Sequence, residues 1–252
     1  MLRLAEMYGT NLDGVRMISN PMDLRTINKY HPLVENLIKK YKLLEADIID
    51  VYPMSSTRFQ GKQIDKAIKI IANLKKRGQN VRFICPNAHA NAVREKKAID
   101  DILLQAEEQG LTREEVIFTS LEGQEYELGV PREVVTQLFS LSNLFVFPSL
   151  SENCPLILLE AAANRCLLIL NDDFPALKDF FHENALYFKF SSLLQQTSYA
   201  DENGWYAEVA KVILGELNKN KPLNSFKELK QRFNRNYILK HQLEPIIFEK
   251  WE

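Results

Sequence analysis

The chain has 252 residues and a mass of 29.2 kDa, with 32 basic and 33 acidic side chains and a formal net charge of −1. Hydrophobic residues make up 46% and charged residues 26% of the chain, which is typical of a globular protein and excludes a disordered one. The nearly neutral charge argues against a protein that holds nucleic acid by neutralising its phosphates. We therefore expect a globular protein with no nucleic-acid partner.

Cysteine content and hydropathy indicate the compartment. Cys85, Cys154 and Cys166 are too few and too irregularly spaced for a disulfide framework or a zinc site, and are typical of buried thiols in a reducing compartment. The longest apolar stretch, 155–170, contains three polar residues and is shorter than the ~20 apolar residues that span a bilayer. Because the N-terminus also lacks a signal-peptide pattern, the sequence predicts a soluble cytoplasmic protein.

Short apolar runs rich in β-branched and aromatic residues alternate with longer helical patterns along the chain. In chain order, the expected strands are 15–19, 47–52, 81–85, 116–119, 144–147, 167–170 and 186–188. The expected helices are 33–44, 62–77, 90–109, 132–140, 155–164, 176–181, 207–217 and one or two between 225 and 251.

The strands are apolar along their whole length, which is typical of a parallel sheet buried on both faces. The alternation with helices predicts an α/β fold with a single Rossmann-like, doubly wound parallel sheet, whose ligands bind at the carboxyl ends of the strands. We expect residues 1–45 to form a lead-in segment or interdomain-linker remnant, 46–190 the Rossmann-like domain, and 191–252 a C-terminal helical tail.

Two glutamates lie where the expected strand 144–147 leads through a polar loop into the next helix. Glu152 lies on the loop, and Glu160 lies in a helix that reads Leu-Ile-Leu-Leu-Glu-Ala-Ala-Ala. Because this helix is apolar on nearly every side, we expect it to be buried, where a lone carboxylate is costly unless it is hydrogen-bonded. Either Glu160 caps a backbone amide or pairs with Arg165 while Glu152 is solvated, or both glutamates belong to a binding site.

Two cations follow another expected strand, 47–52. Arg58 and Lys62 lie in the segment Tyr-Pro-Met-Ser-Ser-Thr-Arg-Phe-Gln-Gly-Lys that enters the next helix. Cations beside a glycine-containing turn and a helix N-terminus suit an anion such as a diphosphate. Lysine and arginine in loops are also commonly just solvated, so the pair by itself leaves both interpretations open.

Together, these segments resemble the C-terminal, donor-binding half of a family 4 (group 1) retaining glycosyltransferase of the GT-B fold, from Ser19 to about Phe190. The most specific match is Pro-Ser-Leu-Ser-Glu152 through Glu160-Ala, with seven residues between the two glutamates. Arg58 and Lys62 match the family's arginine and lysine, at a spacing that is one residue shorter.

The resemblance implies a nucleoside-diphosphate sugar as donor. Glu152 would contact hydroxyls of the donor sugar, and Arg58 and Lys62 would neutralise the departing diphosphate. Glu160 would accept hydrogen bonds from the two ribose hydroxyls. The catalytic residues would then be Glu152, Arg58 and Lys62, and the donor-binding residues Glu160, Asn153, Cys154 and Pro155.

Two positions depart from the family's pattern. Cys154-Pro155 stands where the family often has Phe-Gly, and Arg165 stands where it often has glycine. The resemblance implies a retaining hexosyltransferase that needs no metal ion or other cofactor. It also implies an acceptor-side N-terminal domain, in the same or a separate chain, without which this chain is inactive. A membrane would be involved only indirectly, through a lipid-linked acceptor. The alternative is a non-catalytic α/β module that serves as a binding or assembly surface.

Overall fold

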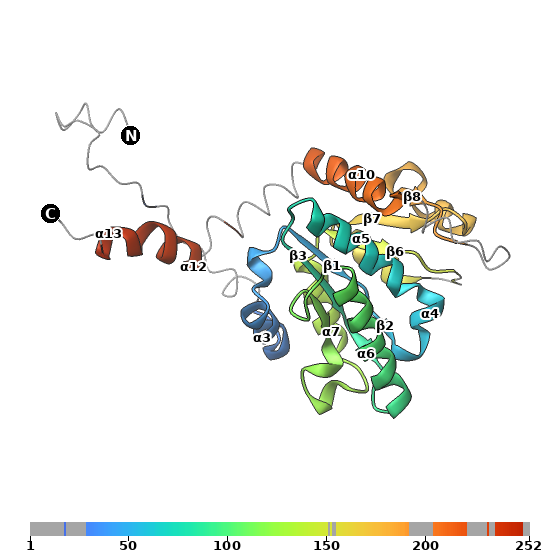
Figure 1. Ribbon diagram of the computed structural model, residues 1–252, viewed down its shortest axis with the longest axis horizontal. Helices are drawn as coiled ribbons and strands as arrows, with labels where there is room; N and C mark the ends of the chain where they lie inside the picture. Colours follow the sequence, from blue (N-terminus) through green and yellow to red (C-terminus); the bar gives the residue numbers. More distant parts are fainter. Residues whose placement is uncertain are drawn as a thin grey trace. The chain divides into compact units, whose positions relative to one another are not determined.

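The computed structural model describes residues 18, 29–150, 152, 155–191, 204–220, 231 and 235–248. It divides into two compact units, one running from Lys29 to Lys227 and one made of the terminal segments Met1–Asn28 and Glu228–Glu252. The first unit carries the α/β fold and the predicted site residues (Figure 1).

A six-stranded parallel sheet forms the centre of the first unit. Its strands are β1 (Ile48–Val51), β3 (Val81–Cys85), β5 (Val116–Phe118), β6 (Leu144–Phe147), β7 (Leu167–Asn171) and β8 (Leu186–Phe188). They are ordered β5-β3-β1-β6-β7-β8, and every pairing is parallel. All residues of β1, β3, β5 and β6 are buried, as expected for strands that are covered on both faces. The predicted fold is confirmed.

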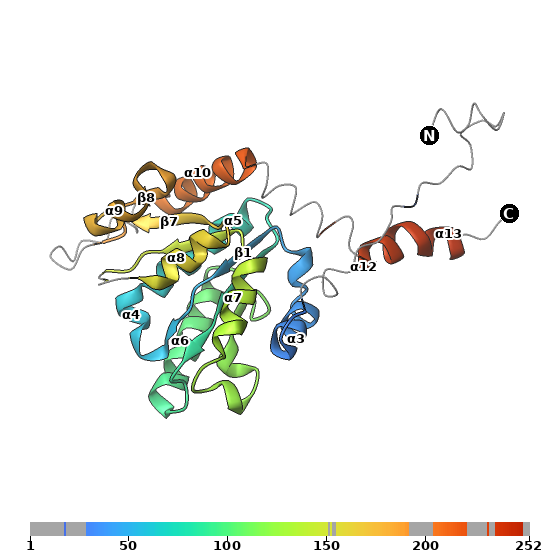
Figure 2. The ribbon, with the colours of Figure 1, turned by 180° about the vertical axis from the view of Figure 1, so that it is seen from behind.

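Helices cover both faces of this sheet, as Figures 1 and 2 show from opposite sides. The larger ones are α3 (Pro32–Lys40), α5 (Ile64–Lys76), α6 (Val93–Glu108), α7 (Arg132–Leu141), α8 (Leu156–Ala163) and α10 (Trp205–Lys219). On one face α5 packs between α6 and α10, and on the other α7 packs between α3 and α8. Right-handed crossovers produce this division, because the chain winds outward from β1 in both directions.

Short elements connect these layers. Strands β2 (Met54–Ser55) and β4 (Asn87–Ala88) pair in parallel as a separate two-stranded sheet beyond β1 and β3. The sequence did not predict them, because two residues are too few to show a strand period. The remaining short helices of this unit are η1 (Leu43–Glu45), η2 (Ser56–Arg58), α4 (Phe59–Lys62), η3 (Thr119–Leu121), η4 (Gln124–Tyr126), η5 (Pro175–Leu177), α9 (Lys178–Phe181) and η6 (His182–Asn184).

The predicted helix 62–77 is broken near its start. Gln63 has a left-handed φ of 51° and separates the single turn α4 from α5. Its side chain is buried and donates a hydrogen bond to the Ser191 hydroxyl, which fixes a conformation that non-glycine residues seldom adopt. The predicted helix 33–44 likewise ends at Lys40, because Lys42 is left-handed before η1.

One hydrophobic core holds the first unit together. It contains Leu33, Val34 and Leu37 of α3 as well as Val209 and Ile213 of α10. Part of the predicted lead-in segment and part of the predicted tail therefore pack with the sheet. The boundaries 1–45, 46–190 and 191–252 otherwise stay predictions.

The second unit is described at Ile18, Gln231 and a continuous helical stretch. That stretch comprises α12 (Arg235–Ile238), the π-helical turn η8 (Leu239–Leu243) and α13 (Glu244–Phe248). It lies within the region 225–251, where helix was predicted. The predicted strand 15–19 lies outside the described residues except for Ile18, which belongs to no strand.

Candidate active site

The strand order places a ligand crevice between β1 and β6. From one edge of the sheet to the other, the strands are the third, second, first, fourth, fifth and sixth in the chain. The connections that follow β1 and β6 therefore run in opposite directions across the sheet. In sheets of this kind the crevice lies outside the carboxyl ends of the two strands at that switch point. The residues that follow β1 and β6 are therefore the first candidates for a site.

Buried polar side chains join β1 to β6 in place of part of the backbone ladder. Asn143 accepts a hydrogen bond from the Ile49 amide at 2.9 Å and donates to the Asp47 carbonyl at 2.8 Å. Asp50 accepts a hydrogen bond from the Val146 amide at 3.2 Å. The two strands at the switch point are thus connected by the side chains of Asn143 and Asp50.

Lys62 and Glu152 form an ion pair at this crevice. Lys62 ends α4, after β1, and its Nζ contacts Glu152 Oε1 on the loop that follows β6. The two side chains are 10% and 11% exposed, so the pair is largely desolvated. Ser149 donates a hydrogen bond to the same carboxylate oxygen at 2.7 Å, and Tyr52 donates one to the Lys62 carbonyl at 2.9 Å. The interpretation in which Glu152 is solvated is therefore wrong.

Arg58 lies at the same edge of the sheet, at the end of η2, with an exposed side chain. It makes no hydrogen bond or ion pair with the part of the chain that the structure describes. Its charge still acts on Tyr52, whose pKa is raised well above the usual range by burial and by Glu152, whereas Arg58 opposes that rise. The structure thus brings Lys62 and Glu152 into contact and leaves the exposed Arg58 at the same edge of the sheet, unpaired within the described ranges.

Glu160 lies in the middle of α8 and pairs with a different arginine from the predicted one. Its Oε1 is 2.8 Å from Nη2 of Arg132, the first residue of α7. The Glu160 side chain is 25% exposed and that of Arg132 is 82% exposed, so the ion pair is accessible to solvent. Arg165, the predicted alternative partner, is exposed and has a left-handed φ of 63°.

The prediction that α8 is buried is wrong. Leu158 and Ala161 are its buried residues, whereas Leu156 and Leu159 are 62% and 43% exposed. The helix packs against β7 and α7, and its Leu156 and Leu159 side chains point away from the core into solvent. This is why Glu160, on a helix that is apolar in sequence, still reaches solvent.

The remaining predicted donor-binding residues are only partly described. Pro155 is buried and directly precedes α8. Asn153 and Cys154 lie outside the described residues, so their contact with a donor stays a prediction. The sequence analysis missed Arg132 and Ser149. Ser149 lies three residues before Glu152 within the matched motif, whereas no sequence signal links Arg132 to Glu160.

Three further titratable groups are buried near the centre of the sheet. Asp50 is fully buried, its Oδ2 has no hydrogen-bond partner among the described residues, and burial raises its pKa well above the usual range against the effect of the Val146 amide. Burial also raises the pKa of the Cys85 thiol, and that of Cys166 to about 12. Both thiols are protonated at neutral pH and are therefore poor nucleophiles.

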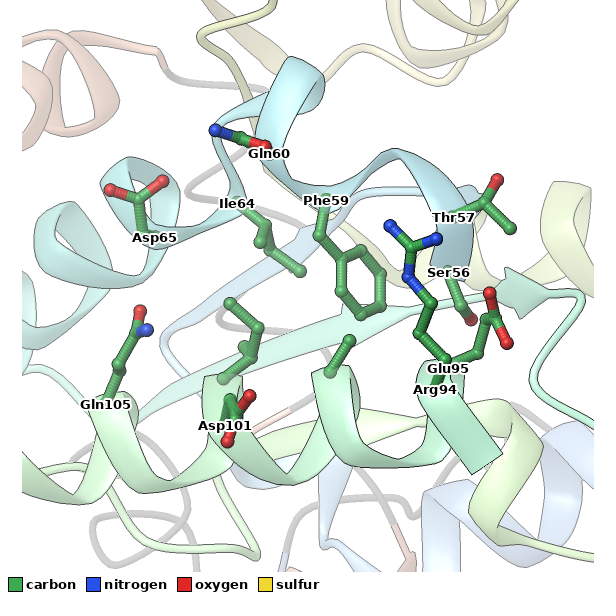
Figure 3. Close-up of a pocket in the computed structure, with 12 residues that line it drawn as sticks. Ser56, Thr57, Phe59, Gln60, Ile64, Asp65, Arg94, Glu95, Asp101 and Gln105 are labelled. Atoms are coloured by element: carbon green, nitrogen blue, oxygen red, sulfur yellow. The ribbon is translucent and has the colours of Figure 1, made fainter. Parts of the chain in front are cut away.

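A pocket of about 560 Å³ lies behind the Arg58–Lys62 segment, between α4–α5 and α6. Figure 3 shows Phe59 and Ile64 on one wall and Arg94, from α6, on the other. The lining residues are Ser56, Thr57, Phe59, Gln60, Ile64, Asp65, Arg94, Glu95, Ala98, Asp101, Ile102 and Gln105. None of the predicted site residues that the structure describes lines this pocket.

Membrane-spanning helices and metal clusters are two further features that could define a function. Among the helices that the structure describes, none is long and apolar enough to cross a bilayer. Within the described ranges, no group of three or more His, Cys, Asp or Glu side chains is arranged to hold a metal ion.

A Rossmann-like parallel sheet with this strand order fits one half of a GT-B glycosyltransferase. The family model for glycosyl transferases group 1 matches residues 40–193. The chain therefore belongs to the group 1 glycosyltransferases, and the resemblance inferred from the sequence is confirmed. No curated protein sequence matches the chain significantly.

Two solved structures with TM-scores above 0.5 support the fold. An α,α-trehalose-phosphate synthase (UDP-forming) from Burkholderia xenovorans, in complex with glucose-6-phosphate, is 12% identical, with a TM-score of 0.52. An E. coli structure described as "Trehalose-6-phosphate from E. coli bound with UDP-2-fluoro glucose" is 14% identical, with a TM-score of 0.51. The matches cover 85% and 87% of this chain but only 44% and 47% of those chains. A glycosyltransferase from Rickettsia africae ESF-5 is 14% identical, with a TM-score of 0.49, over 99% of this chain and 62% of that one.

Proposed function

We propose that this chain is the donor domain of a retaining glycosyltransferase and binds a nucleoside-diphosphate sugar. The observation that carries the proposal is the desolvated Lys62–Glu152 pair at the β1–β6 switch point, at the same edge of the sheet as the exposed Arg58. Lys62 and Arg58 can stabilise the charge that develops on the departing diphosphate without a metal ion. Glu152 can accept hydrogen bonds from sugar hydroxyls and Glu160 from ribose hydroxyls.

Two comparison structures are consistent with this assignment. One is described as bound with UDP-2-fluoro glucose, and another as UDP-forming and in complex with glucose-6-phosphate. Because the chain spans less than half the length of either, we propose that an acceptor-side domain, in the same or a separate chain, supplies the rest of the active site. The acceptor would be held there, and a membrane would be involved only if that acceptor is lipid-linked.

Exposed apolar side chains support a partner at the carboxyl edge of the sheet. Val93 is 86% exposed, Leu128 67%, Leu156 62% and Leu121 57%. All four follow the carboxyl end of a strand, on the side of the sheet that carries Lys62 and Glu152. A non-catalytic assembly module would use the same surface, so nucleotide binding, which only the donor domain requires, separates the two proposals.

Nucleotide titration tests the donor-domain proposal. We expect UDP, GDP or ADP to bind the chain, and a nucleotide at 100 times its dissociation constant to add about 2.7 kcal/mol of stability. Replacing Arg58 with alanine should weaken that binding at least tenfold, because a charge-assisted hydrogen bond to phosphate contributes about 1.5–3 kcal/mol. Arg94→Ala, at another exposed arginine outside the site, is the matched control for calorimetric titration. If no nucleotide binds, the assembly module is the better proposal.

Glu160 provides a second test. Glu160→Gln should weaken nucleotide binding by about 1.5–3 kcal/mol, because a charged acceptor for the ribose hydroxyls is lost. Arg132→Gln removes the same ion pair but leaves the carboxylate, so affinity should stay equal or rise. Both variants should lose less than about 1 kcal/mol of stability, since the pair is solvent-exposed. Equal affinities in the two variants, measured by calorimetry beside urea unfolding, would contradict a ribose-binding Glu160.

The isolated chain should transfer no sugar. Positioning two reactants contributes several kcal/mol to such a reaction, and one half of a cleft holds only one of them. Robust transfer by the purified chain alone would contradict the proposed need for an acceptor-side domain.

A further inference from the structure

A second buried lysine lies four residues after Lys62, in the first turn of α5. Lys66 is 7% exposed, and its Nζ donates to the Phe190 carbonyl at 2.7 Å and to the Ser191 hydroxyl at 3.1 Å. Gln63 Nε2 donates to the same hydroxyl. The start of α5 is therefore attached to the segment that follows β8, although the two are more than 120 residues apart in the chain.

Asn171 attaches that same segment to the loop that bears Glu152. It ends β7, is fully buried, and its amide donates to the Ser191 carbonyl at 3.0 Å and to the Ser149 carbonyl at 3.2 Å. Its Oδ1 accepts from the amides of Phe190 and Asp173 at 3.3 and 3.1 Å. Both donor positions and the acceptor of this amide are thus in use.

These contacts close a ring of polar groups. We call it the polar ring, and its members in order are Lys62, Glu152, Ser149, Asn171, Ser191 and Gln63, with Lys66 bonded to the same Ser191 hydroxyl as Gln63. The peptide bond between Gln63 and Lys62 closes the ring. The Leu150 amide, which donates to the Gly61 carbonyl at 3.2 Å, spans the ring between the β6 loop and α4.

We propose that Asn171 and Lys66 are positioning residues that hold Lys62 and Glu152 in the geometry of the donor site. This inference rests on the proposed function, because it concerns the same site. Asn171 acts through Ser149, whose hydroxyl donates to Glu152, and Lys66 acts through Ser191 and the first turn of α5. Both residues therefore act on the Glu152 carboxylate through other groups.

The physical argument is the cost of burying these groups. A buried ammonium and a buried amide each require hydrogen-bond partners, and here most partners are backbone carbonyls of segments distant in sequence. The arrangement of these segments in the structure satisfies both side chains. Losing either donor leaves buried carbonyls of Ser149, Phe190 or Ser191 without a hydrogen bond. The β6 loop and α4 then lose the contacts that fix the distance between them.

Amide hydrogen exchange tests the polar ring without any ligand. In Asn171→Ala and in Lys66→Met, the Leu150 amide should exchange at least tenfold faster than in the unmodified chain, relative to the Ile84 amide in β3. Asn143→Ala is the matched control for the first variant, because Asn143 is also a buried amide bonded to backbone, at the opposite end of the sheet. Lys69→Met, three residues further along α5, is the control for the second. Both controls should leave the ratio of the two exchange rates unchanged.

Nucleotide titration of the same variants completes the test. Asn171→Ala and Lys66→Met should bind the best nucleotide diphosphate at least tenfold more weakly than their controls do. If the unmodified chain binds no nucleotide, the proposed function fails, but the amide exchange rates still test whether the polar ring holds the β6 loop against α4. If Asn143→Ala loosens the Leu150 amide as much as Asn171→Ala does, or if Lys66→Met leaves that amide unchanged, the positioning role is overturned. Should Asn171→Ala fail to fold, Lys66→Met decides alone.

Discussion

Replacing Lys62 with methionine is expected to lower the free energy of unfolding by about 3 kcal/mol. The substitution keeps an apolar side chain of similar length but removes the ammonium group, which lies over the Phe147 ring, and leaves the Glu152 carboxylate desolvated and without its cation. Removing one partner of a buried pair typically costs this much, because the remaining charge is uncompensated. Urea unfolding of the variant and the unmodified chain at pH 7 measures the difference.

The double variant Lys62→Met/Glu152→Leu is the control for this result. It removes both charges, so most of the lost stability should return, as when apolar residues replace other buried ion pairs. Nucleotide binding should be absent from both the single and the double variant if the pair belongs to a donor site. A single variant as stable as the unmodified chain would mean that the pair is solvated. A double variant that binds nucleotide normally would mean that it has no role in binding.

Asp50 is expected to lower the stability of the chain progressively as the pH rises above about 4. Burial raises the pKa of this carboxyl group well above that of an unfolded chain, so the folded state keeps a proton that the unfolded state releases. Between the two pKa values, this group lowers the free energy of unfolding by about 1.4 kcal/mol for each pH unit. Below the unfolded pKa the penalty disappears.

Asp50→Asn isolates this contribution. The amide oxygen can still accept the Val146 hydrogen bond, but the residue no longer titrates. We expect the variant to match the unmodified chain near pH 4 and to exceed it by more than about 1 kcal/mol at pH 7. Asp101→Asn, at an exposed position of α6, should leave the pH profile as it is. Parallel profiles of Asp50→Asn and the unmodified chain, from urea unfolding between pH 4 and 8, would contradict a raised Asp50 pKa.

Much of the fold was predictable from the sequence, because fully apolar strands such as 81–85 and 144–147, alternating with helices, are typical of a parallel sheet covered on both faces. The convergence of Lys62 and Glu152 was predictable as well, since each follows a strand and parallel strands end at the same edge. The break at Gln63 was not, because its left-handed backbone depends on the distant Ser191. The partner of Glu160 was not predictable either, because Arg132 reaches it from another helix.

The Lys62–Glu152 pair also bears on how fast an anionic ligand reaches this crevice. Two opposite charges in contact present almost no field at a distance, so the pair itself cannot draw a diphosphate from solution. Of the three predicted catalytic residues, the exposed Arg58 is the one whose field reaches the incoming ligand. Of the long-range attraction that these three residues exert, most would then come from Arg58, and their contribution to the encounter rate would depend only weakly on ionic strength.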